Sequence, residues 1–301
     1  MKPIVFTLPG NENWSANLSD CLPAEQGTLQ LRRFPDEETC LRITSAVAGR
    51  DVIIACTLDR PDTKLVPLYL LASALRAQGA HHIVLLAPYL AYMRQDHIFH
   101  EGETVSAAHI ARWLSGFLDG VVTVDPHLHR IARLAEIYSV PTRVVHAAPA
   151  MGRWIAQAVV HPLLIGPDAE SRPWVEATAR AIGCPSVILQ KVRYGDRDVQ
   201  VSIPGVQAYL DYSPVLVDDI VSTGYTMLET TKALRVIGFA APVCVAVHAI
   251  FAGTACEQLR QAGVERIVSC DTVAHATNTI ALHRELAQAT RELLDELSAS
   301  S

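Results

Sequence analysis

Short runs of β-branched and other apolar residues alternate along this chain with segments whose apolar residues recur at helical spacing. Residues 51–55 predict a buried strand, residues 63–78 predict a helix that stops at Gly79, and residues 82–86 predict the next strand. A strand, a helix and a second strand in this order form a βαβ unit with parallel strands. The alternation therefore predicts an α/β fold built on mainly parallel sheets.

The same alternation occurs in both halves of the chain. The other predicted strands are 121–124, 163–166, 186–189, 214–220, 243–249 and 266–270, and the other predicted helices are 105–117, 172–182, 226–237 and 280–297. A length of 301 residues suggests about two domains of ~150 residues each. We place the boundary in the connecting stretch 142–150, and we predict two α/β domains, 1–145 and 146–301.

The composition excludes several classes of protein. Half of the residues are hydrophobic, 19% are charged and the formal net charge is −6, which suits sizeable cores and argues against a disordered chain. The absence of any Lys/Arg-rich run argues against a nucleic-acid partner and against an anionic membrane surface. The apolar stretch near 240–252 is well below the ~20 residues of a membrane-spanning helix, and the N-terminal apolar stretch is too short for a signal peptide.

The cysteines indicate a reducing compartment. There are seven of them, an odd number, and no pair has zinc-finger or CxxC spacing. Reduced, buried thiols are the simplest interpretation. The sequence therefore predicts a soluble cytoplasmic protein with neither a nucleic-acid nor a membrane partner.

One segment carries most of the chemical information. An apolar strand ends in two adjacent carboxylates, Asp218 and Asp219, and a turn and a helix follow. The residues of the turn and the first helical positions are Ser222, Thr223, Gly224, Tyr225 and Thr226. Backbone N–H groups, hydroxyls and the positive end of a helix suit a phosphate, whereas the carboxylates suit the hydroxyls of a sugar. An ordinary helix N-cap is the alternative, but two carboxylates at the end of an apolar strand are costly without a ligand or partner. We therefore predict a site for a phosphorylated polyol.

The segment 215–226 resembles the loop that binds 5-phosphoribosyl diphosphate (PRPP) in phosphoribosyltransferases and PRPP synthetases. Five further segments resemble the PRPP synthetases (ribose-phosphate diphosphokinases) and not the transferases. They are Phe34-Pro35-Asp36-Glu37-Glu38, Pro88-Tyr89-Leu90-Ala91-Tyr92-Met93-Arg94-Gln95-Asp96, Val124-Asp125-Pro126-His127, Gly166-Pro167-Asp168 and Lys191-Val192-Arg193. The resemblance runs in order from Phe34 to Thr272, and the segments Gly195-Asp196-Arg197 and Phe99-x-x-Gly102-Glu103 lean toward the archaeal-type branch.

The resemblance implies an activity and a set of residue roles. The enzyme would transfer the β,γ-diphosphoryl group of ATP to the C1 hydroxyl of ribose 5-phosphate, giving PRPP and AMP, with Mg²⁺ as cofactor. Lys191 and Arg193 would be the catalytic residues, on a flexible loop. The residues implied for ATP are Phe34, Asp36, Glu37, Glu38, Arg94, Gln95, Asp96 and His127. Those implied for ribose 5-phosphate are Asp168, Asp218, Asp219, Ser222, Thr223, Gly224, Tyr225 and Thr226, and the metal would be held by His127 and Asp168.

The resemblance also implies a fold and an assembly. Each half would be a phosphoribosyltransferase-like domain, a mainly parallel sheet flanked by helices. The segment from Phe34 to Glu38 would line the adenine site of a neighbouring subunit, so we expect a homo-oligomer. Dimer, tetramer and hexamer all stay open, as do allosteric control by ADP or phosphate and the preferred nucleotide donor.

The sequence departs from the family pattern at several of these positions. Tyr225 stands where the family usually has glycine, His97 replaces a frequent arginine, and Pro126 replaces a leucine. Glu170-Ser171 replaces the usual pair of glycines after Asp168. A side chain at 225 must point away from a bound phosphate or fill space beside it.

These departures keep two alternatives in view. One is a non-catalytic subunit associated with PRPP synthetases, and the less favoured one is a phosphoribosyltransferase. The presence of Lys191, Arg193, His127 and Asp168 favours an active enzyme. The segment 191–204 fits both a solvated β-hairpin and an active-site loop that carries cations.

Overall fold

The computed structural model describes the backbone of residues 1–98, 100–194, 198–202 and 206–300, and their side chains except those of 190–207. The chain forms two compact units, which we call unit 1 (Met1–Val145 with His283–Ser301) and unit 2 (His146–Leu282). The last helix thus belongs to unit 1, which differs from the predicted second domain of 146–301.

The sheet of unit 1 has the strand order β2-β1-β5-β6-β7-β8, and every neighbouring pair is parallel. The strands are β1 (Ile4–Thr7), β2 (Glu25–Gln26), β5 (Val52–Ala55), β6 (Ile83–Ala87), β7 (Gly120–Val124) and β8 (Thr142–Val145). Every residue of β5, β6 and β7 is buried. This burial is the pattern of parallel strands that are covered on both faces.

Amphipathic helices provide that cover. They are α1 (Glu12–Ser19), α2 (Leu65–Ala77), α3 (Ser106–Ser115) and α8 (His283–Ser300), with two short 3₁₀ helices, η1 (Pro61–Thr63) and η2 (Leu134–Glu136). In α2 the residues Leu68, Leu71, Ala72 and Leu75 are fully buried. Their spacing of three and four residues places them on one side of the helix, so this side joins the core of unit 1.

Helix α8 packs on β7 and β8 of unit 1. Leu293 is fully buried, and the position that a Cβ atom would take on Gly120 lies only 2.9 Å from its side chain. Only a residue without a side chain at 120 lets the helix approach so closely. An ion pair between Arg143 and Glu296 adds a polar contact at the edge of this interface. The helical spacing of residues 280–297 predicts the helix, but it does not say which sheet the helix will cover.

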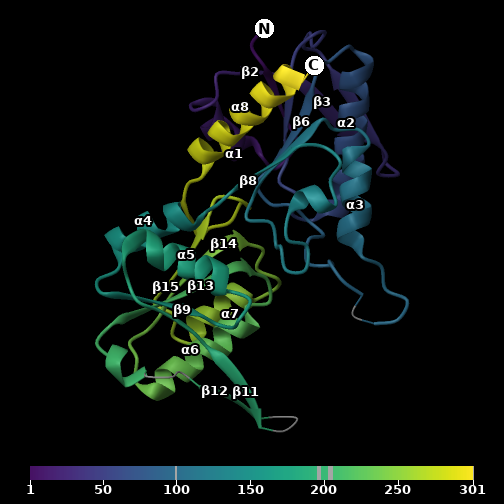
Figure 1. Cartoon of the computed structure of the whole chain (residues 1–301). Helices are drawn as coiled ribbons and strands as arrows, with labels where there is room; N and C mark the ends of the chain where they lie inside the picture. Colours follow the sequence, from purple (N-terminus) through teal and green to yellow (C-terminus); the bar gives the residue numbers. More distant parts are fainter. Residues whose placement is uncertain (99, 195–197, 203–205, 301) are drawn as a thin grey trace. The chain divides into compact units, whose positions relative to one another are not determined.

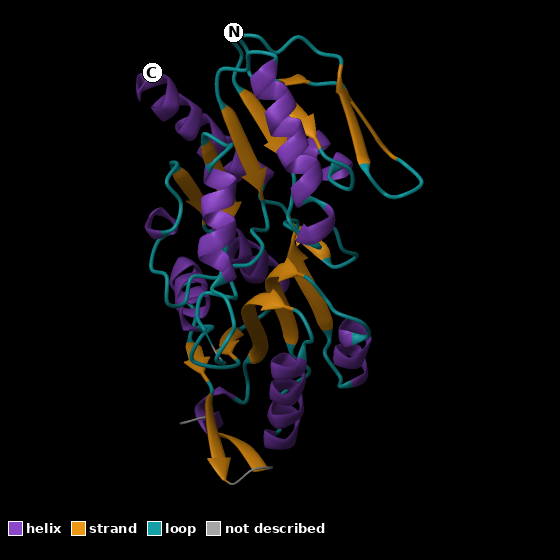
Figure 2. Cartoon of the chain, turned by 90° about the vertical axis from the view of Figure 1, so that its right-hand side faces the viewer, coloured by secondary structure: helices purple, strands orange, loops and turns teal. Residues whose placement is uncertain are grey.

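Two strands of unit 1 form a hairpin of their own. Strand β3 (Leu29–Arg33) pairs antiparallel with β4 (Thr39–Ile43), and Figure 2 shows this hairpin standing apart from the larger sheet. The apolar residues Leu29, Leu31 and Leu41 are only partly buried and pack on the edge of the core.

Unit 2 repeats the plan of unit 1. Its sheet has the order β10-β9-β13-β14-β15-β16, again with parallel pairs throughout. The strands are β9 (Pro162–Gly166), β10 (Ser186–Ile188), β13 (Ser213–Val221), β14 (Val243–Ala249), β15 (Arg266–Cys270) and β16 (Asn278–Ile280). The predicted fold class, α/β with parallel sheets flanked by helices, is therefore confirmed.

The helices of unit 2 lie on both faces of its sheet. They are α4 (Ala148–Ala158), α5 (Arg172–Ile182), α6 (Tyr225–Ile237) and α7 (Ala255–Gln261), with the 3₁₀ helix η3 (Val206–Tyr209). Figure 1 shows α4 and α5 on one face and α6 and α7 on the other. A separate antiparallel ladder joins β11 (Gln190–Tyr194) to β12 (Asp198–Ser202). In neither unit does a helix of the described chain have the length and apolar character needed to cross a membrane.

Candidate active site

The topology of unit 2 selects one place in its sheet for a ligand. From β9 the chain moves outward to β10 in one direction, whereas from β13 it moves through β14 and β15 in the other. The order therefore reverses between β9 and β13, and the loops at their carboxyl ends leave toward opposite faces. A crevice at such a reversal is the usual ligand site of an open α/β sheet. Three of the predicted site carboxylates, Asp168, Asp218 and Asp219, lie at this place.

Asp168 follows β9 and is held by the turn that precedes α5. Its Oδ1 atom accepts hydrogen bonds from the backbone N–H groups of Glu170 and Ser171, at 3.1 and 3.2 Å. The Ser171 hydroxyl in turn donates to the carbonyl oxygen of Asp168 at 2.6 Å. These bonds fix the carboxylate at the carboxyl end of β9, next to β13.

Asp218 and Asp219 lie inside β13, because the strand continues to Val221 and pairs with β14 on either side of Asp219. The sequence pattern predicts a strand at 214–220, so the carboxylates sit one residue deeper in the sheet than expected. The backbone N–H of Asp219 donates to Asp218 Oδ1 at 3.0 Å, and that of Ile220 donates to Asp219 Oδ1 at 2.8 Å.

The electrostatics of this place are unfavourable without a partner of opposite charge. Burial is the largest cause that raises the pKa of Asp218 well above its ordinary value, and the negative charges of Asp219 and Asp168 raise it further. The rise in pKa means that the folded unit disfavours the ionised form of Asp218. A cation or a set of hydroxyl donors placed here would relieve that cost.

The turn that follows β13 is shaped by its backbone. Gly224 has φ of +67°, a left-handed conformation that glycine adopts without strain, and it precedes the first residue of α6. The neighbouring loop supports the turn, because the N–H groups of Phe251 and Ala252 donate to the carbonyl oxygens of Val221 and Ser222, both at 2.9 Å. The predicted phosphate-binding residues 222–226 thus surround the N-terminus of a helix of 13 residues.

Tyr225 is the first residue of α6, and 66% of its surface is exposed. Its side chain therefore points into solvent and does not pack inside the turn. The position where the family usually has glycine therefore accommodates a tyrosine whose side chain points outward.

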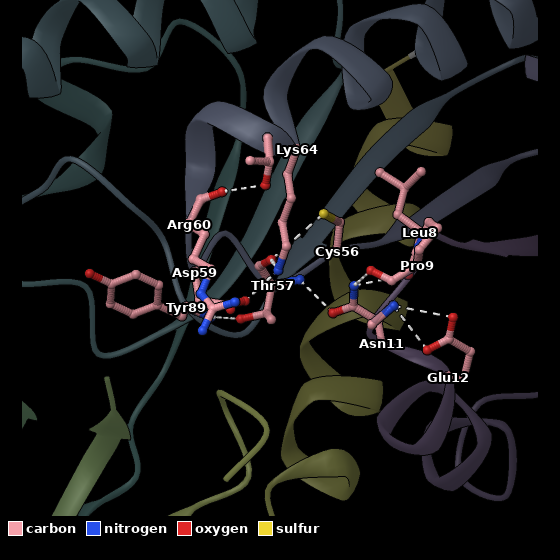
Figure 3. A network of polar contacts seen from close by, with 12 residues as sticks. Leu8, Pro9, Asn11, Glu12, Cys56, Thr57, Asp59, Arg60, Lys64 and Tyr89 are labelled. Atoms are coloured by element: carbon pink, nitrogen blue, oxygen red, sulfur yellow. Dashed lines mark hydrogen bonds and ion pairs between the residues drawn. The ribbon is translucent and has the colours of Figure 1, made fainter. Parts of the chain in front are cut away.

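Unit 1 has the same reversal of strand order between β1 and β5, and Figure 3 shows what fills it. Asn11 donates from Nδ2 to the carbonyl oxygen of Leu8 at 3.0 Å and accepts a hydrogen bond from the N–H of Thr57 at 2.9 Å. The Thr57 hydroxyl accepts from the N–H of Tyr89 at 3.1 Å. Lys64 donates to the Thr57 carbonyl oxygen at 2.9 Å and forms an ion pair with Asp59. The polar groups at this reversal therefore bind the loops of unit 1 to one another.

The loops after β6 and β7 carry four of the predicted nucleotide residues of unit 1, which are Arg94, Gln95, Asp96 and His127. Arg94 and Gln95 are exposed in the turn that follows β6. Asp96 is buried, and its two carboxylate oxygens accept from the backbone N–H of Arg130 at 2.9 Å and from its guanidinium at 3.2 Å. Asp96 thus ties the loop after β6 to the loop after β7, on which His127 is half-buried.

Residues 3–117 match the family model of the N-terminal domain of ribose phosphate pyrophosphokinase, and residues 144–283 match the phosphoribosyl transferase domain. The ribose-phosphate pyrophosphokinase of Methanopyrus kandleri is 31% identical over 92% of this chain and 94% of its own length. That of Halobacterium salinarum is 32% identical over 93% of this chain and 97% of its own length. The chain belongs to the ribose-phosphate pyrophosphokinase family.

A solved structure agrees with the fold of this pyrophosphokinase. The phosphoribosylpyrophosphate synthetase of Mycobacterium smegmatis superimposes with a TM-score of 0.87 and covers 98% of this chain and all of its own, at 20% identity. The predicted family, the predicted class of enzyme and the two phosphoribosyltransferase-like domains are therefore confirmed. Relatives from archaea such as Methanopyrus and Halobacterium agree with the predicted lean toward the archaeal-type branch.

The remaining predicted site residues lie on the hairpin of β3 and β4 and on the ladder of β11 and β12. Phe34, Asp36, Glu37 and Glu38 are exposed in the turn between β3 and β4, which is closed by a hydrogen bond from the Phe34 N–H to the Glu38 carbonyl oxygen at 2.8 Å. The Arg32 guanidinium lies 4.7 Å from the centre of the Phe34 ring.

Residues 191 and 193 occupy alternate positions of β11, opposite Val201 and Val199 of β12. They therefore share one face of the ladder. The side chains of Lys191 and Arg193, and residues 195–197, lie outside the described part of the chain.

Some residues that shape the site carry no clear signal in the sequence. Asn11, Thr57 and Arg130 act through hydrogen bonds to positions 32 to 46 residues away along the chain. A pattern of local spacing cannot reveal such pairs. Only the turn residues around Asn11, such as Pro9 and Gly10, mark this region as a loop.

Proposed function

We propose that this pyrophosphokinase transfers the β,γ-diphosphoryl group of ATP to the C1 hydroxyl of ribose 5-phosphate and releases AMP. The observation that carries the proposal is the place of Asp168, Asp218 and Asp219 at the reversal of strand order in unit 2, beside the turn 222–226. This place combines acceptors for sugar hydroxyls with a helix N-terminus for a phosphate. A phosphorylated pentose is the ligand that uses both.

The chain's own groups would bind the sugar in one orientation. Asp218 and Asp219 would accept hydrogen bonds from the ribose hydroxyls. The N–H groups and hydroxyls of residues 222–226 would bind the 5-phosphate. The positive end of α6 would favour the negative charge of that phosphate. Two fixed ends leave the C1 hydroxyl as the free reactive group of the sugar.

The donor groups of unit 2 fit Mg²⁺ as the cofactor. Mg²⁺ prefers oxygen ligands and one or two carboxylates together with substrate phosphates. Asp168 offers such a carboxylate beside Asp218, whose pKa is raised by burial and by nearby negative charge. Bound Mg²⁺ would neutralise charge on the phosphoryl oxygens during transfer. Asp168 and His127 would hold the metal together, and His127 would also lie beside the phosphates of the nucleotide.

The remaining roles follow the family pattern. Arg94 and Gln95 would bind the triphosphate, and Asp96 would position their turn through Arg130. Lys191 and Arg193 would stabilise the charge that develops in the transition state, and removal of one such group costs about 10²–10³ in rate.

The same pattern suggests the assembly and the location. The exposed turn from Phe34 to Glu38 would contact the adenine of ATP bound to a neighbouring copy, which makes the enzyme a homo-oligomer. The seven cysteines, all among the described residues, are free thiols, which supports the expected cytoplasmic compartment.

The test is AMP release from ATP and Mg²⁺, with and without ribose 5-phosphate, for the wild type and Lys191→Ala. We expect release that depends on the sugar and falls about 10²–10³-fold in the variant. Lys232→Ala is a matched control, because Lys232 is an exposed lysine of unit 2 that pairs with Glu229 on α6. A wild type that binds ribose 5-phosphate without releasing AMP would indicate a non-catalytic subunit.

A further inference from the structure

A compact group of side chains that can bind metals lies in unit 1, at the amino ends of its strands and opposite to the predicted nucleotide loops. Asp51 immediately precedes β5, and His81 and His82 immediately precede β6. Because β5 and β6 are parallel neighbours, with Val52 opposite Ile83, their amino ends lie side by side. The three side chains meet there, whereas the loops that carry Arg94 and His127 leave from the carboxyl ends of the strands.

The contacts within this group centre on one oxygen atom. Asp51 Oδ1 lies 3.1 Å from His81 Nδ1 and 2.9 Å from His82 Nδ1. The two imidazole rings have their centres 3.9 Å apart, and one ligand atom from each of the three residues lies within 4.8 Å of the others.

We propose that Asp51, His81 and His82 bind a divalent transition-metal ion, with Zn²⁺ as the best fit. Zn²⁺ accepts two imidazole nitrogens and a carboxylate oxygen at about 2.0–2.2 Å, so its ligand atoms lie roughly 3–3.5 Å from one another. The distances from Asp51 Oδ1 to the Nδ1 atoms of His81 and His82 already match this separation between ligand atoms. The two imidazole nitrogens also give this site a different metal preference from the carboxylates of unit 2, which suit Mg²⁺.

The burial of the three residues suits a site that is fixed on one side and open on the other. His82 is 8% exposed, whereas the His81 side chain is 48% exposed. The backbone of His82 is held by the sheet, since the Val52 N–H donates to the His82 carbonyl oxygen at 2.7 Å. An ion can therefore enter from solvent past His81 and keep a water molecule as its fourth ligand.

The nearby cations do not oppose an added positive charge strongly. Arg50 pairs with Glu25 at 2.7 Å, and Arg76 pairs with Asp119 while it donates to the His81 carbonyl oxygen at 2.9 Å. Each guanidinium thus already has a carboxylate beside it. The bound ion would link the segment before β5 to the segment before β6, two segments that the Gly49 N–H joins to the Gly79 carbonyl oxygen at 2.7 Å.

Binding of Co²⁺ as a spectroscopic substitute for Zn²⁺ tests the site in the full-length protein, after chelation and in excess Mg²⁺. We expect saturable visible absorption with one ion per chain. His81→Ala and Asp51→Asn should each weaken binding at least about tenfold, because each removes a direct ligand. Asp51→Asn keeps the size of the side chain, and His81 is exposed, so both variants should fold.

His109→Ala is the matched control, since His109 is an exposed histidine on α3 of the same unit. It should bind Co²⁺ as the wild type does. Zn²⁺ at about 100 times its dissociation constant should raise the Tm of the wild type by about 5 °C and leave that of His81→Ala unchanged. AMP release in Mg²⁺ should be equal in all these proteins.

Three results would overturn the proposal. The first is a wild type that shows no saturable Co²⁺ absorption. The second is equal affinity in the wild type and His81→Ala. The third is an ion that is retained in His81→Ala and lost in His127→Ala, which would assign the metal to the loop after β7 instead.

Discussion

The two units of the chain share one topology but place opposite chemistry at the same point of it. In unit 1 the reversal of strand order between β1 and β5 is filled by Asn11 and Thr57, which are 3% and 5% exposed and bound to backbone groups. In unit 2 the equivalent reversal, between β9 and β13, holds Asp168, Asp218 and Asp219. The repeated topology thus places neutral polar groups at one reversal and three carboxylates at the other.

The difference lies in what the polar groups contact. Neutral amide and hydroxyl groups in unit 1 satisfy the loops around them, and the resulting bonds stabilise the fold. In unit 2, burial and then the negative charges of Asp219 and Asp168 raise the pKa of Asp218. The ionised carboxyl is therefore unfavourable in the fold, and a cation or hydroxyl donors would favour it. The comparison predicts that substitutions at the two reversals will separate activity from stability.

The largest expected effect is that of Asp218→Asn. The substitution removes a charged acceptor for the sugar, so AMP release should fall about 10²–10³-fold. The free energy of unfolding at neutral pH should not fall, because the substitution removes a carboxyl whose ionised form the fold disfavours. Steady-state kinetics together with urea unfolding check both statements. Lower stability in Asp218→Asn would contradict this expectation.

The next effect is that of Asn11→Ala in unit 1. It leaves the buried N–H of Thr57 without its acceptor, and such a group costs about 1–3 kcal/mol of unfolding free energy. Urea unfolding measures this loss. The rate of AMP release per folded molecule should change far less than in Asp218→Asn, and an equal loss of activity would place Asn11 in the catalytic machinery.

The pH dependence of stability separates the two units further. Because the pKa of Asp218 is raised in the folded state, its contribution to stability is complete below the ordinary carboxyl pKa of 3.8 and is lost as the pH rises through the raised value. The stability of the wild type relative to Asp218→Asn should therefore fall with rising pH. Mg²⁺ should reduce this fall, because a cation favours the ionised carboxyl. Parallel pH profiles for the two proteins would contradict the assignment.

The smallest effect is expected for Tyr225→Gly, which restores the residue usual in the family. Since 66% of the Tyr225 surface is exposed, KM for ribose 5-phosphate should change by about twofold or less. Glycine at the first helical position should cost no more than about 1 kcal/mol of unfolding free energy. A change of KM above tenfold would show that the tyrosine contacts the substrate.

Local patterns predict the units of this fold well. The apolar runs at 51–55 and 82–86 become β5 and β6, and the predicted helix 226–237 becomes α6 with one more residue at its start. These elements are predictable because burial on a sheet and a helical stripe both depend on spacing within a few residues. The hairpin of β3 and β4 has only half-buried apolar residues, so its pattern is too weak to be predicted.

Contacts between distant residues explain what the patterns leave open. Helix α8 covers unit 1 because Gly120 lets Leu293 approach and Arg143 meets Glu296, and no spacing within 280–297 encodes that choice. Asp96 fits the family's ATP segment by sequence, yet its contact with Arg130 is visible only when both loops are placed.

The sequence alone determined the alternation of strands and helices, the family and the set of candidate residues, since each is written in short runs of neighbouring positions. The tertiary structure decided which of those residues meet. It placed Asp168 near Asp218 on two neighbouring parallel strands, and it placed Asn11 at the equivalent reversal of unit 1. It also brought Asp51, His81 and His82 together at the amino ends of two strands. The physical reason is that charge, burial and hydrogen bonding act through space, between residues that the chain itself keeps far apart.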